Sequence, residues 1–310
     1  MIIIDGIEHI KKKYPYPVLT IGNFDGVHLG HQSIFKMVTD KAGKKKGTSI
    51  VFTFEPHPLR VIAPERAPSR LTPFKSKAEL IKKHGIDVLV CANFTKEFSH
   101  MTAEDFVHDI LWDAIGVKEI FIGANYRFGK GRKGCPEMLK ELGNEYGFKV
   151  TSIPDITYNN ITLSSSKVRS LIAKGKVDEA PLFLGRHYSV EGVVIEGAKR
   201  GKALLNIPTA NISTSNELLP MDGVYAVKVK FDKKTYCGAA NIGVNPTFKQ
   251  MKLSFEVHIF DFDDEIVGRE INVEFIKRIR DEKKFAGVEE LAQQMRNDIE
   301  EIKTVLKDKH

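Results

Sequence analysis

The sequence predicts two domains of different class: an α/β domain with a parallel sheet, followed by a β domain in which antiparallel strands form a barrel that carries a terminal helix. The chain of 310 residues, of which 42% are hydrophobic, is long enough to bury two cores. Short apolar runs alternate with helical patterns in the first part, and an apolar period of two replaces them after about Leu184. We therefore expect domains at residues 1–184 and 185–310.

Short apolar runs in the first domain are typical of buried strands, and they occupy residues 18–22, 48–54, 87–94, 119–125 and 149–154. Between them, residues 75–84 and 103–115 have the three- and four-residue apolar spacing of helices. Thr102 and Asp105 form the capping pattern that starts such a helix. Strands that alternate with helices indicate a parallel sheet covered on both faces, and such sheets bind ligands at the carboxyl ends of their strands.

The second domain has the alternation of strands with one buried face. Residues 224–231, 254–262 and 271–275 each alternate apolar and polar side chains. Close-spaced strands of this kind indicate an antiparallel sheet or small barrel. Residues 288–306 place their apolar side chains along a single helical stripe, which predicts one terminal helix.

The composition narrows the possible partners. A net charge of +7 and a pI of about 9.1 favour anionic partners, but the chain shows no nucleic-acid-binding motif or basic-aromatic stripe. It has no run of about 18 apolar residues, and residues 1–5 lack the charged start of a signal peptide. The cysteines Cys91, Cys135 and Cys237 follow no metal-ligand spacing. We expect a cytoplasmic protein that binds neither nucleic acid nor membrane.

A glycine-rich loop in residues 22–31 directly follows the first predicted strand and leads into a helix. Glycines at such a turn permit close backbone approach, and the helix amino terminus attracts anions. His28 and His31 are three residues apart, so on a helical turn they share one face. Two imidazoles directed at one phosphate can stabilise the charge on its oxygens, which predicts a phosphate-handling site.

At these residues the sequence resembles a known family. His28-Leu29-Gly30-His31 is similar to the signature of nucleotidyltransferases that transfer AMP or CMP from a nucleoside triphosphate. Residues 22–32 resemble the bacterial bifunctional riboflavin kinase/FAD synthetases. Residues 54–58, 123–130 and 164–169 match the same family, and each segment lies at or just after the carboxyl end of a predicted strand.

The resemblance implies a Rossmann-like nucleotidyltransferase domain that transfers AMP from ATP to FMN, giving FAD and pyrophosphate. His28 and His31 would be catalytic, binding the ATP phosphates. Because the FMN phosphate is already ionised near neutral pH, the chemistry needs positioning and charge neutralisation more than a strong base. The implied ATP-binding residues are Gly22, Phe24, Asp25, Gly26, Asn125, Lys130, Ser165 and Arg169. The implied flavin-binding residues of this domain are Phe54, Pro56, His57, Pro58 and Phe128.

Pro208-Thr209-Ala210-Asn211 resembles the signature of riboflavin kinases. A threonine hydroxyl and an asparagine carbonyl are hard oxygen ligands, so Thr209 and Asn211 are the expected ligands of Mg²⁺. The resemblance makes Glu256 the general base that takes the proton of the ribityl hydroxyl as it attacks the γ-phosphorus of ATP. It further implies ATP binding by Gly197 and Lys202, and flavin binding by Arg280.

Two pairs depart from the family pattern. Asn206-Ile207 stand where the family usually has Gly-Phe, and Val267-Gly268 stand where it usually has Tyr-Gly. A glycine lost from a nucleotide loop crowds the backbone. A narrower interpretation therefore stays open, in which the chain is an FMN adenylyltransferase only, with a weakened or regulatory C-terminal flavin-binding module.

Two other classes complete the alternatives. A nucleic-acid-binding protein would show salt-sensitive binding to DNA or RNA. A transferase for another mononucleotide would explain the paired histidines but leave the second domain without a role. The resemblance itself implies riboflavin, FMN and ATP as small-molecule substrates, FAD as product, Mg²⁺ for both steps, and a monomer or weak homo-oligomer.

Overall fold

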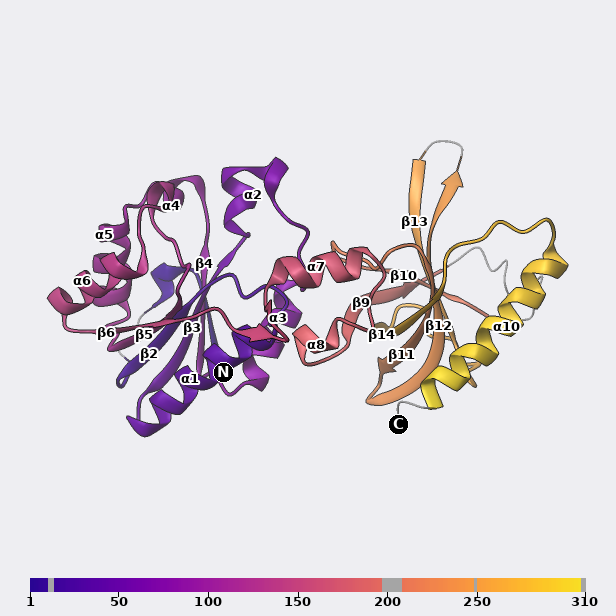
Figure 1. Cartoon of the computed structure of the whole chain (residues 1–310), viewed down its shortest axis with the longest axis horizontal. Helices are drawn as coiled ribbons and strands as arrows, with labels where there is room; N and C mark the ends of the chain where they lie inside the picture. Colours follow the sequence, from indigo (N-terminus) through magenta and orange to yellow (C-terminus); the bar gives the residue numbers. More distant parts are fainter. Residues whose placement is uncertain (11–13, 197–207, 248–249, 308–310) are drawn as a thin grey trace. The chain divides into compact units, whose positions relative to one another are not determined.

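The computed structural model describes residues 1–10, 14–196, 208–247 and 250–307, with the backbone alone between 244 and 253. The chain forms two compact units, Met1–Ser164 and Ser165–His310, drawn as a ribbon in Figure 1. The expected boundary after residue 184 lies within the second unit and stays a prediction.

The first unit is built on a six-stranded sheet with the order β1-β4-β3-β2-β5-β6, in which every neighbouring pair is parallel. Its strands are β1 (Ile2–Asp5), β2 (Pro17–Ile21), β3 (Thr48–Glu55), β4 (Val88–Asn93), β5 (Glu119–Gly123) and β6 (Lys149–Ile153). The parallel sheet and its five expected strands are confirmed. The sequence analysis missed β1, because this short edge strand leaves Ile2 and Ile3 exposed and so lacks the pattern of a buried strand.

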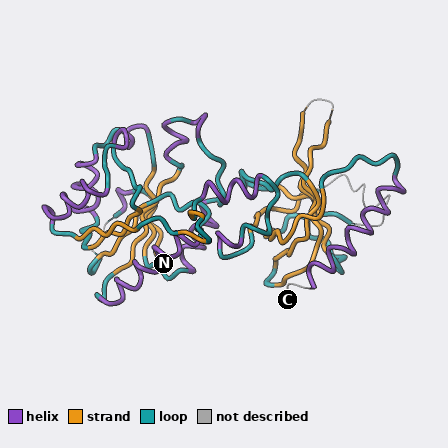
Figure 2. Tube along the Cα trace, viewed as in Figure 1, coloured by secondary structure: helices purple, strands orange, loops and turns teal. Residues whose placement is uncertain are grey.

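Helices cover both faces of this sheet, and Figure 2 shows them flanking its strands. On one face, α1 (Leu29–Lys44) and α3 (Phe74–Lys83) bury apolar side chains such as Phe35 and Ile81 against the strands. On the other face lie α5 (Ala103–Asp105), η3 (Phe106–Ala114) and α6 (Pro136–Tyr146). The side chains on both faces form the core, where burial of apolar area stabilises the unit.

The helix expected at residues 103–115 begins as predicted and then changes type. The Thr102 hydroxyl accepts a hydrogen bond from the Asp105 amide at 3.0 Å, as the capping pattern requires. After α5, however, the chain continues as the π-helical segment η3. The wider π turn is rare and is not visible in a three- and four-residue apolar pattern.

Shorter elements connect the main ones. They are η1 (Ile7–His9), α2 (Pro58–Ile62), η2 (Pro64–Arg66), α4 (Lys96–Ser99) and η4 (Lys130–Arg132), together with a hairpin of β7 (Thr157–Tyr158) and β8 (Ile161–Thr162). Asn159 and Asn160 at the hairpin tip both have positive φ, as a tight two-residue turn requires.

The second unit contains a closed barrel with the order β10-β13-β12-β11-β14-β9, antiparallel throughout. Its strands are β9 (Tyr188–Ile195), β10 (Ala210–Ser213), β11 (Gly223–Phe231), β12 (Lys234–Thr247), β13 (Gln250–Ile259) and β14 (Glu270–Arg280). Helices α7 (Ser165–Ala173) and α8 (Pro181–Leu184) precede the barrel, and α10 (Val288–Lys307) follows it. The expected barrel with a terminal helix is confirmed.

Strand β11 shows how the barrel and α10 share one core. Tyr225, Val227 and Val229 are fully buried on one side of the strand. On the other side, Val224 and Ala226 pack in a cluster with Ile302 and Leu306 of α10. The strand is therefore apolar on both sides over its first half, and α10 completes the burial of the outer side.

None of the helices in the described residues is both long and apolar enough to cross a membrane.

Candidate functional sites

The loop between β2 and α1 lies at the switch point of the parallel sheet. From β2 the chain proceeds to β3 and β4 on one side, and then returns to place β5 on the other side of β2. The loops that leave β2 and β5 therefore diverge and open a crevice at the carboxyl ends of the strands, where ligands of such sheets bind. Residues 22–28 form the first of these loops.

The paired histidines open α1. His28 is its N-cap, and its Nδ1 atom accepts a hydrogen bond from the His31 amide at 3.4 Å. The two imidazole rings stack with centroids 3.6 Å apart. Gly30 allows this arrangement, because a Cβ atom at that position would lie 3.1 Å from the His28 ring. The structure thus confirms that the two rings share one face.

His31 is held as a neutral ring. Burial is the main cause that lowers its pKa well below the ordinary value, and the neighbouring His28 and Lys77 lower it further. Among the residues that the structure describes, the buried Nδ1 atom of His31 has no hydrogen-bond partner. A buried polar atom left unpaired is unusual and is consistent with a ligand at this place.

The backbone of the loop is tightly constrained. Phe24, Gly26 and Val27 all have positive φ, at 50°, 81° and 42°. The Phe24 ring is buried and meets the ring of Phe35 on α1 edge to face, with centroids 5.0 Å apart. At Gly26 a Cβ atom would lie 2.7 Å from Leu71. Strained backbone of this kind persists where the surroundings hold it, and it is common at functional sites.

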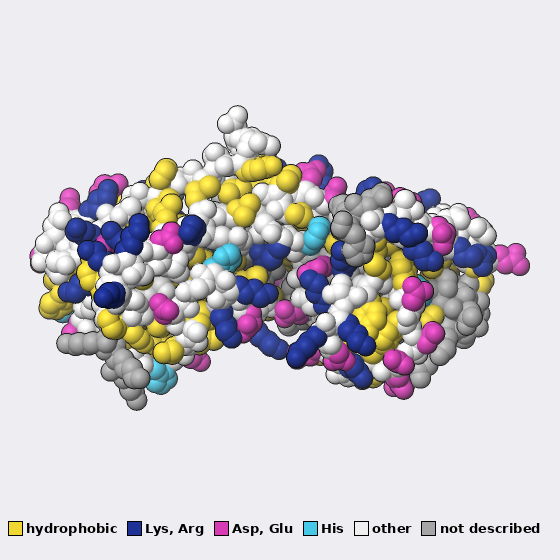
Figure 3. Space-filling view, turned by 90° about the horizontal axis from the view of Figure 1, so that it is seen from below, with side chains coloured by type: hydrophobic (Ala, Val, Ile, Leu, Met, Phe, Trp, Pro, Cys, Tyr) yellow, Lys and Arg dark blue, Asp and Glu magenta, His cyan; other side chains and the backbone are white. Residues whose placement is uncertain are grey.

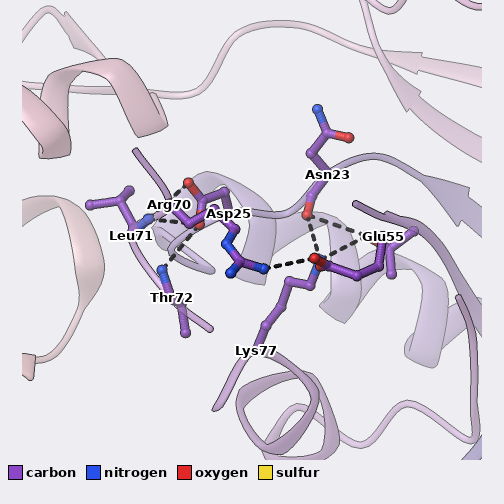
Figure 4. A network of polar contacts seen from close by, with 8 residues as sticks. Asn23, Asp25, Glu55, Arg70, Leu71, Thr72 and Lys77 are labelled. Carbon is purple, nitrogen blue, oxygen red and sulfur yellow. Dashed lines mark hydrogen bonds and ion pairs between the residues drawn. The ribbon is translucent and has the colours of Figure 1, made fainter. Parts of the chain in front are cut away.

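Asp25 has a supporting role in this structure. Its side chain is 7% exposed. Its carboxylate accepts hydrogen bonds from the amides of Leu71, at 3.0 Å, and Thr72, at 3.2 Å (Figure 4). The carboxylate therefore holds the segment before α3, and the expected contact with ATP at Asp25 stays a prediction, as it does for the buried Phe24.

The expected flavin residues of the first unit begin at the end of β3. Phe54 belongs to an aromatic cluster with Phe94 and Phe98. Pro56 follows a cis peptide bond, and Pro58 is the first residue of α2.

His57 links this segment to the histidine loop. Its Nδ1 atom accepts the Leu59 amide at 3.2 Å and caps α2, and its Nε2 atom contacts the Asn23 side-chain amide at 3.0 Å. The ring of Phe128 is 7% exposed and packs against Tyr126 and Phe106.

The remaining expected ATP residues of the first half are dispersed. Asn125 and Lys130 are exposed in the segment after β5, where the Asn125 amide donates to Asp155 at 3.1 Å. Ser165 and Arg169 lie on α7, in the second compact unit. The structure brings together Gly22, Gly26, His28, His31 and His57, and the contributions of these residues and of the four dispersed ones stay predictions.

Sequence reasoning missed two residues. Asn23 belongs to the loop, and Lys77 on α3 donates a hydrogen bond to the Asn23 carbonyl. Lys77 lies in the helix expected at residues 75–84, where a lysine indicates an exposed charge. Nothing in the linear pattern distinguishes it from Lys82 or Lys83 on the same helix. It also missed a cavity of about 430 Å³ in this unit, at the carboxyl ends of β1 and β4, lined by Asp5, Glu8 and Cys91 among others.

The candidate kinase site is a cavity of about 430 Å³ between the barrel and the segment that ends in α10. Its lining includes Thr209, which directly precedes β10, and Asn241, Glu256 and His258 from the barrel strands. It also includes Arg280, Lys283 and Phe285 from the end of β14 and the loop after it, and Met295, Asp298 and Ile299 from α10. The structure thus gathers the expected base, one expected metal ligand and the expected flavin residue around one cavity.

A single cross-strand row explains why these residues meet. Asn211 pairs with Glu256 across β10 and β13, and Glu256 pairs with Asn241 across β13 and β12. Asn241 pairs with Val224, which in turn pairs with Arg280 on β14. Residues directly opposite one another project to the same face of a sheet. The row therefore runs around the outer face of the barrel, towards α10.

Glu256 is half-buried and takes part in two hydrogen bonds. Its Oε2 atom accepts from the Thr209 hydroxyl at 3.3 Å, and its Oε1 atom accepts from the Ser254 hydroxyl at 2.9 Å. These bonds fix the carboxylate beside the Pro208–Asn211 string.

Arg280 is anchored by α10. Its Nε atom donates to the Asp298 carboxylate at 3.0 Å and its Nη2 atom at 2.8 Å, while its Nη1 atom donates to the Asp281 carbonyl at 2.9 Å. The Phe285 ring lies 5.7 Å from the guanidinium carbon. Asp298 is 5% exposed and was not expected from the sequence, where it is one more polar residue on an amphipathic helix.

The donor set near Glu256 fits a magnesium ion that is shared with nucleotide phosphates. A hydroxyl from Thr209, an amide carbonyl from Asn211 and a nearby carboxylate are the oxygen ligands that Mg²⁺ prefers, and it usually keeps few protein ligands beside phosphate and water. Within the described residues, no group of three or more His, Cys, Asp or Glu side chains could hold a metal by itself.

Several expected positions lie outside the described residues: Gly197, Lys202 and the departing pair Asn206-Ile207. The other departing pair is visible. Val267 is 51% exposed. Gly268 has a φ of 84°, so the turn keeps the positive φ that favours glycine, although the preceding residue is valine and not tyrosine.

Comparisons with known proteins cover both halves of the chain. Residues 10–167 match the family model described as FAD synthetase, and residues 184–306 match the one described as riboflavin kinase. The chain belongs to the bifunctional riboflavin kinase/FMN adenylyltransferase family. The narrower interpretation, a single active half, is not favoured, because both family models match.

Members of the family resemble this chain over nearly its whole length. The protein named bifunctional riboflavin kinase/FMN adenylyltransferase from Buchnera aphidicola subsp. Acyrthosiphon pisum is 40% identical over 302 residues, 96% of each chain. Its namesake from Escherichia coli K12 is 36% identical and covers 91% of this chain and 90% of its own. A crystal structure described as a macrolide-efflux protein from Streptococcus pneumoniae is 31% identical, has a TM-score of 0.87, and covers 97% of this chain and 98% of its own.

Proposed function

We propose that this chain phosphorylates riboflavin with ATP to give FMN, and transfers AMP from a second ATP to FMN to give FAD and pyrophosphate. The observation that carries the proposal is the presence of two separate polar sites, one in each compact unit, at the positions of the two family motifs. The net charge of +7 does not require a basic surface patch that binds nucleic acid. On the face drawn in Figure 3, lysine and arginine side chains are interspersed with acidic ones.

In the adenylyl transfer, the FMN phosphate attacks the α-phosphorus of ATP. His28 and His31 bind the phosphates at the start of α1. Because Nδ1 of His28 accepts the His31 amide, the proton of its neutral ring lies on Nε2, ready to donate to a phosphate oxygen. The unpaired Nδ1 atom of His31 supports a polar ligand here. The stack fixes both rings, so little reorganisation is required when charge develops on the phosphate.

In the kinase reaction, Glu256 takes the proton of the terminal ribityl hydroxyl as this oxygen attacks the γ-phosphorus. The hydroxyls of Thr209 and Ser254 orient the carboxylate, which supports its role as a base. Thr209 and Asn211 would hold Mg²⁺, which supplies positive charge for the phosphate oxygens when bound. Arg280 and Phe285, at the end wall of the cavity, would contact the flavin.

Incubation with riboflavin, ATP and Mg²⁺, followed by chromatography of the flavins, tests the proposal. We expect both FMN and FAD. His28→Ala should accumulate FMN without FAD, and Glu256→Ala should form FAD from supplied FMN but no FMN from riboflavin. The assignment of separate sites is wrong if either substitution removes both activities while the fold remains intact.

The proposal also includes the location of the enzyme in the cell and its oligomeric state. Dependence on ATP and the absence of disulfides among the described cysteines are consistent with a cytoplasmic enzyme. We further propose that the chain is a monomer or a weak homo-oligomer, and sedimentation at micromolar concentration tests this.

A further inference from the structure

Lys77 on α3 is an almost fully buried lysine beneath the histidine loop. Its side chain is 5% exposed. Its Nζ atom donates to the Thr53 hydroxyl at 3.2 Å and to the Asn23 carbonyl at 3.3 Å (Figure 4). The ring of Phe74, one turn earlier on the helix, lies 5.5 Å away.

The ammonium group of Lys77 has neutral partners, and the nearby carboxylates are held by other groups. Glu55 pairs with Arg70 at 2.7 Å, and Asp25 accepts the amides of Leu71 and Thr72. Within the described residues, no carboxylate oxygen lies within the 4.0 Å of an ion pair with Lys77. A buried cation without a close counter-ion costs stability. Its presence therefore points to a role beyond holding the fold.

The position of Lys77 connects it to the paired histidines. Its Nζ atom donates to the Asn23 carbonyl, which also accepts a hydrogen bond from the Thr53 hydroxyl at 3.3 Å. Phe24, the next residue, begins the run of positive φ that leads to His28. The side chain of Asn23 contacts His57 on the opposite side of the loop. Lys77 thus fixes the first residue of the turn from the core side.

Lys77 also supplies positive charge, which the residues of the loop do not. Residues 22–31 contain no lysine or arginine, and His31 is neutral under ordinary conditions because burial and the neighbouring His28 lower its pKa. Lys77 lies close enough to lower that pKa as well. Burial is the main cause that lowers the pKa of Lys77, and the nearby Glu55, Cys91 and Asp25 act against this shift while Arg70 adds to it. The charged or titratable groups that act on His31 are His28 and Lys77.

We propose that Lys77 is a positioning residue for adenylyl transfer. It holds the Asn23 carbonyl, so that the loop presents His28 and His31 to the substrate. It also places a buried positive charge beneath the bound phosphates. The inference rests on the proposed function of this unit. In the reaction, Lys77 acts by positioning the loop and through the electrostatic field of its charge, and it requires no contact with the substrate.

The test compares Lys77→Met, which keeps the length and removes the charge, with Lys77→Gln, which keeps a donor for Asn23. Lys82→Met, at an exposed lysine on the same helix, is the control. FAD formation from FMN and ATP is measured as kcat and KM, and thermal unfolding followed by circular dichroism reports whether the first unit, which contains Lys77, is folded.

We expect kcat for FAD formation to fall about 10- to 100-fold in Lys77→Met, with a smaller change in KM for ATP, because the lost charge acts chiefly in the transition state. Lys77→Gln should retain some of this rate, and Lys82→Met all of it. Removing the positive charge should raise the pKa of His31, so that its NMR titration moves to higher pH in both Lys77 variants.

Four outcomes decide the inference. A folded Lys77→Met or Lys77→Gln with the original kcat and the original His31 titration overturns it. Unfolding of the first unit in Lys77→Gln also overturns it, because that result indicates a structural role alone. A lower kcat with an upward His31 titration and intact kinase activity supports it. If the unsubstituted protein makes no FAD from FMN, the proposed function fails first.

Discussion

Arg280 and Asp298 form a largely buried ion pair at the end wall of the kinase cavity. The side chains are 14% and 7% exposed, and Asp298 also accepts from Gln294 at 2.8 Å. Such a pair adds little net stability over apolar residues, but removing one partner leaves a buried charge uncompensated. The ion pair serves to orient these side chains. The Asp298 carboxylate fixes the Arg280 guanidinium, and the hydrogen bonds between them join α10 to β14.

Asp298→Asn should destabilise the protein by about 3 kcal/mol, because the amide keeps one acceptor but leaves the Arg280 charge without a counter-ion. The KM for riboflavin should rise, while FAD formation from FMN should be unaffected. Chemical denaturation and the two assays measure these effects.

Asp281→Asn is the matched control. Asp281 is 76% exposed and pairs with Arg278 at the surface, so its loss should change stability by about 0–1 kcal/mol. Equal destabilisation by the two substitutions would contradict the role given to Asp298.

At the scale of elements, local chemistry decides where helices begin, and packing decides how they continue. Thr102 and His57 cap α5 and α2 through side-chain acceptors, as elementary helix physics requires. The π-helical geometry of η3 has no such local signal. Its apolar residues Phe106, Val107, Ile110 and Leu111 are all buried against the sheet, so contacts with the rest of the unit fix its geometry.

Thr102→Ala should lower the free energy of unfolding by about 1 kcal/mol, because the Asp105 amide loses its acceptor. Thr102→Ser should keep most of the stability, since its hydroxyl can accept the same bond. Urea denaturation compares the variants. Indistinguishable midpoints for the alanine and serine variants would contradict the capping role.

At the scale of the whole molecule, two folds place two phosphate-transfer sites in one chain. The parallel sheet uses the end of β2 and the start of α1, whereas the barrel uses the outer face of its strands beneath α10. Both reactions move a phosphorus centre that carries several negative charges, so both need positive charge that is placed in advance. One site has the stacked imidazoles of His28 and His31 with Lys77 nearby, and the other has oxygen ligands suited to Mg²⁺ beside Arg280.

Removal of divalent cations with excess EDTA should therefore stop FMN formation from riboflavin, and added Mg²⁺ should restore it. FAD formation from supplied FMN should stop as well, because ATP is used with its metal in both steps. Chromatography of the flavins follows both reactions. Continued FMN formation in EDTA would contradict the metal role of Thr209 and Asn211.

The linear pattern was sufficient for the classes of the two units. Apolar runs alternating with helical spacing define a parallel sheet, and a period of two defines the barrel, because these periods follow from backbone geometry alone. The histidine string and Glu256 were identified from their motifs. The edge strand β1 was missed, since an exposed strand with a single partner has no burial pattern.

The sequence by itself determined the two fold classes, the start of α5 and the family, because each depends on residues that are close along the chain. Only the tertiary structure assigned Asp25 to the Leu71 and Thr72 amides, brought Asn211, Glu256 and Arg280 into one cross-strand row, and buried Lys77 and Asp298. These relations join residues far apart in sequence. The physical reason is that register and burial arise from packing between elements, which no local spacing records.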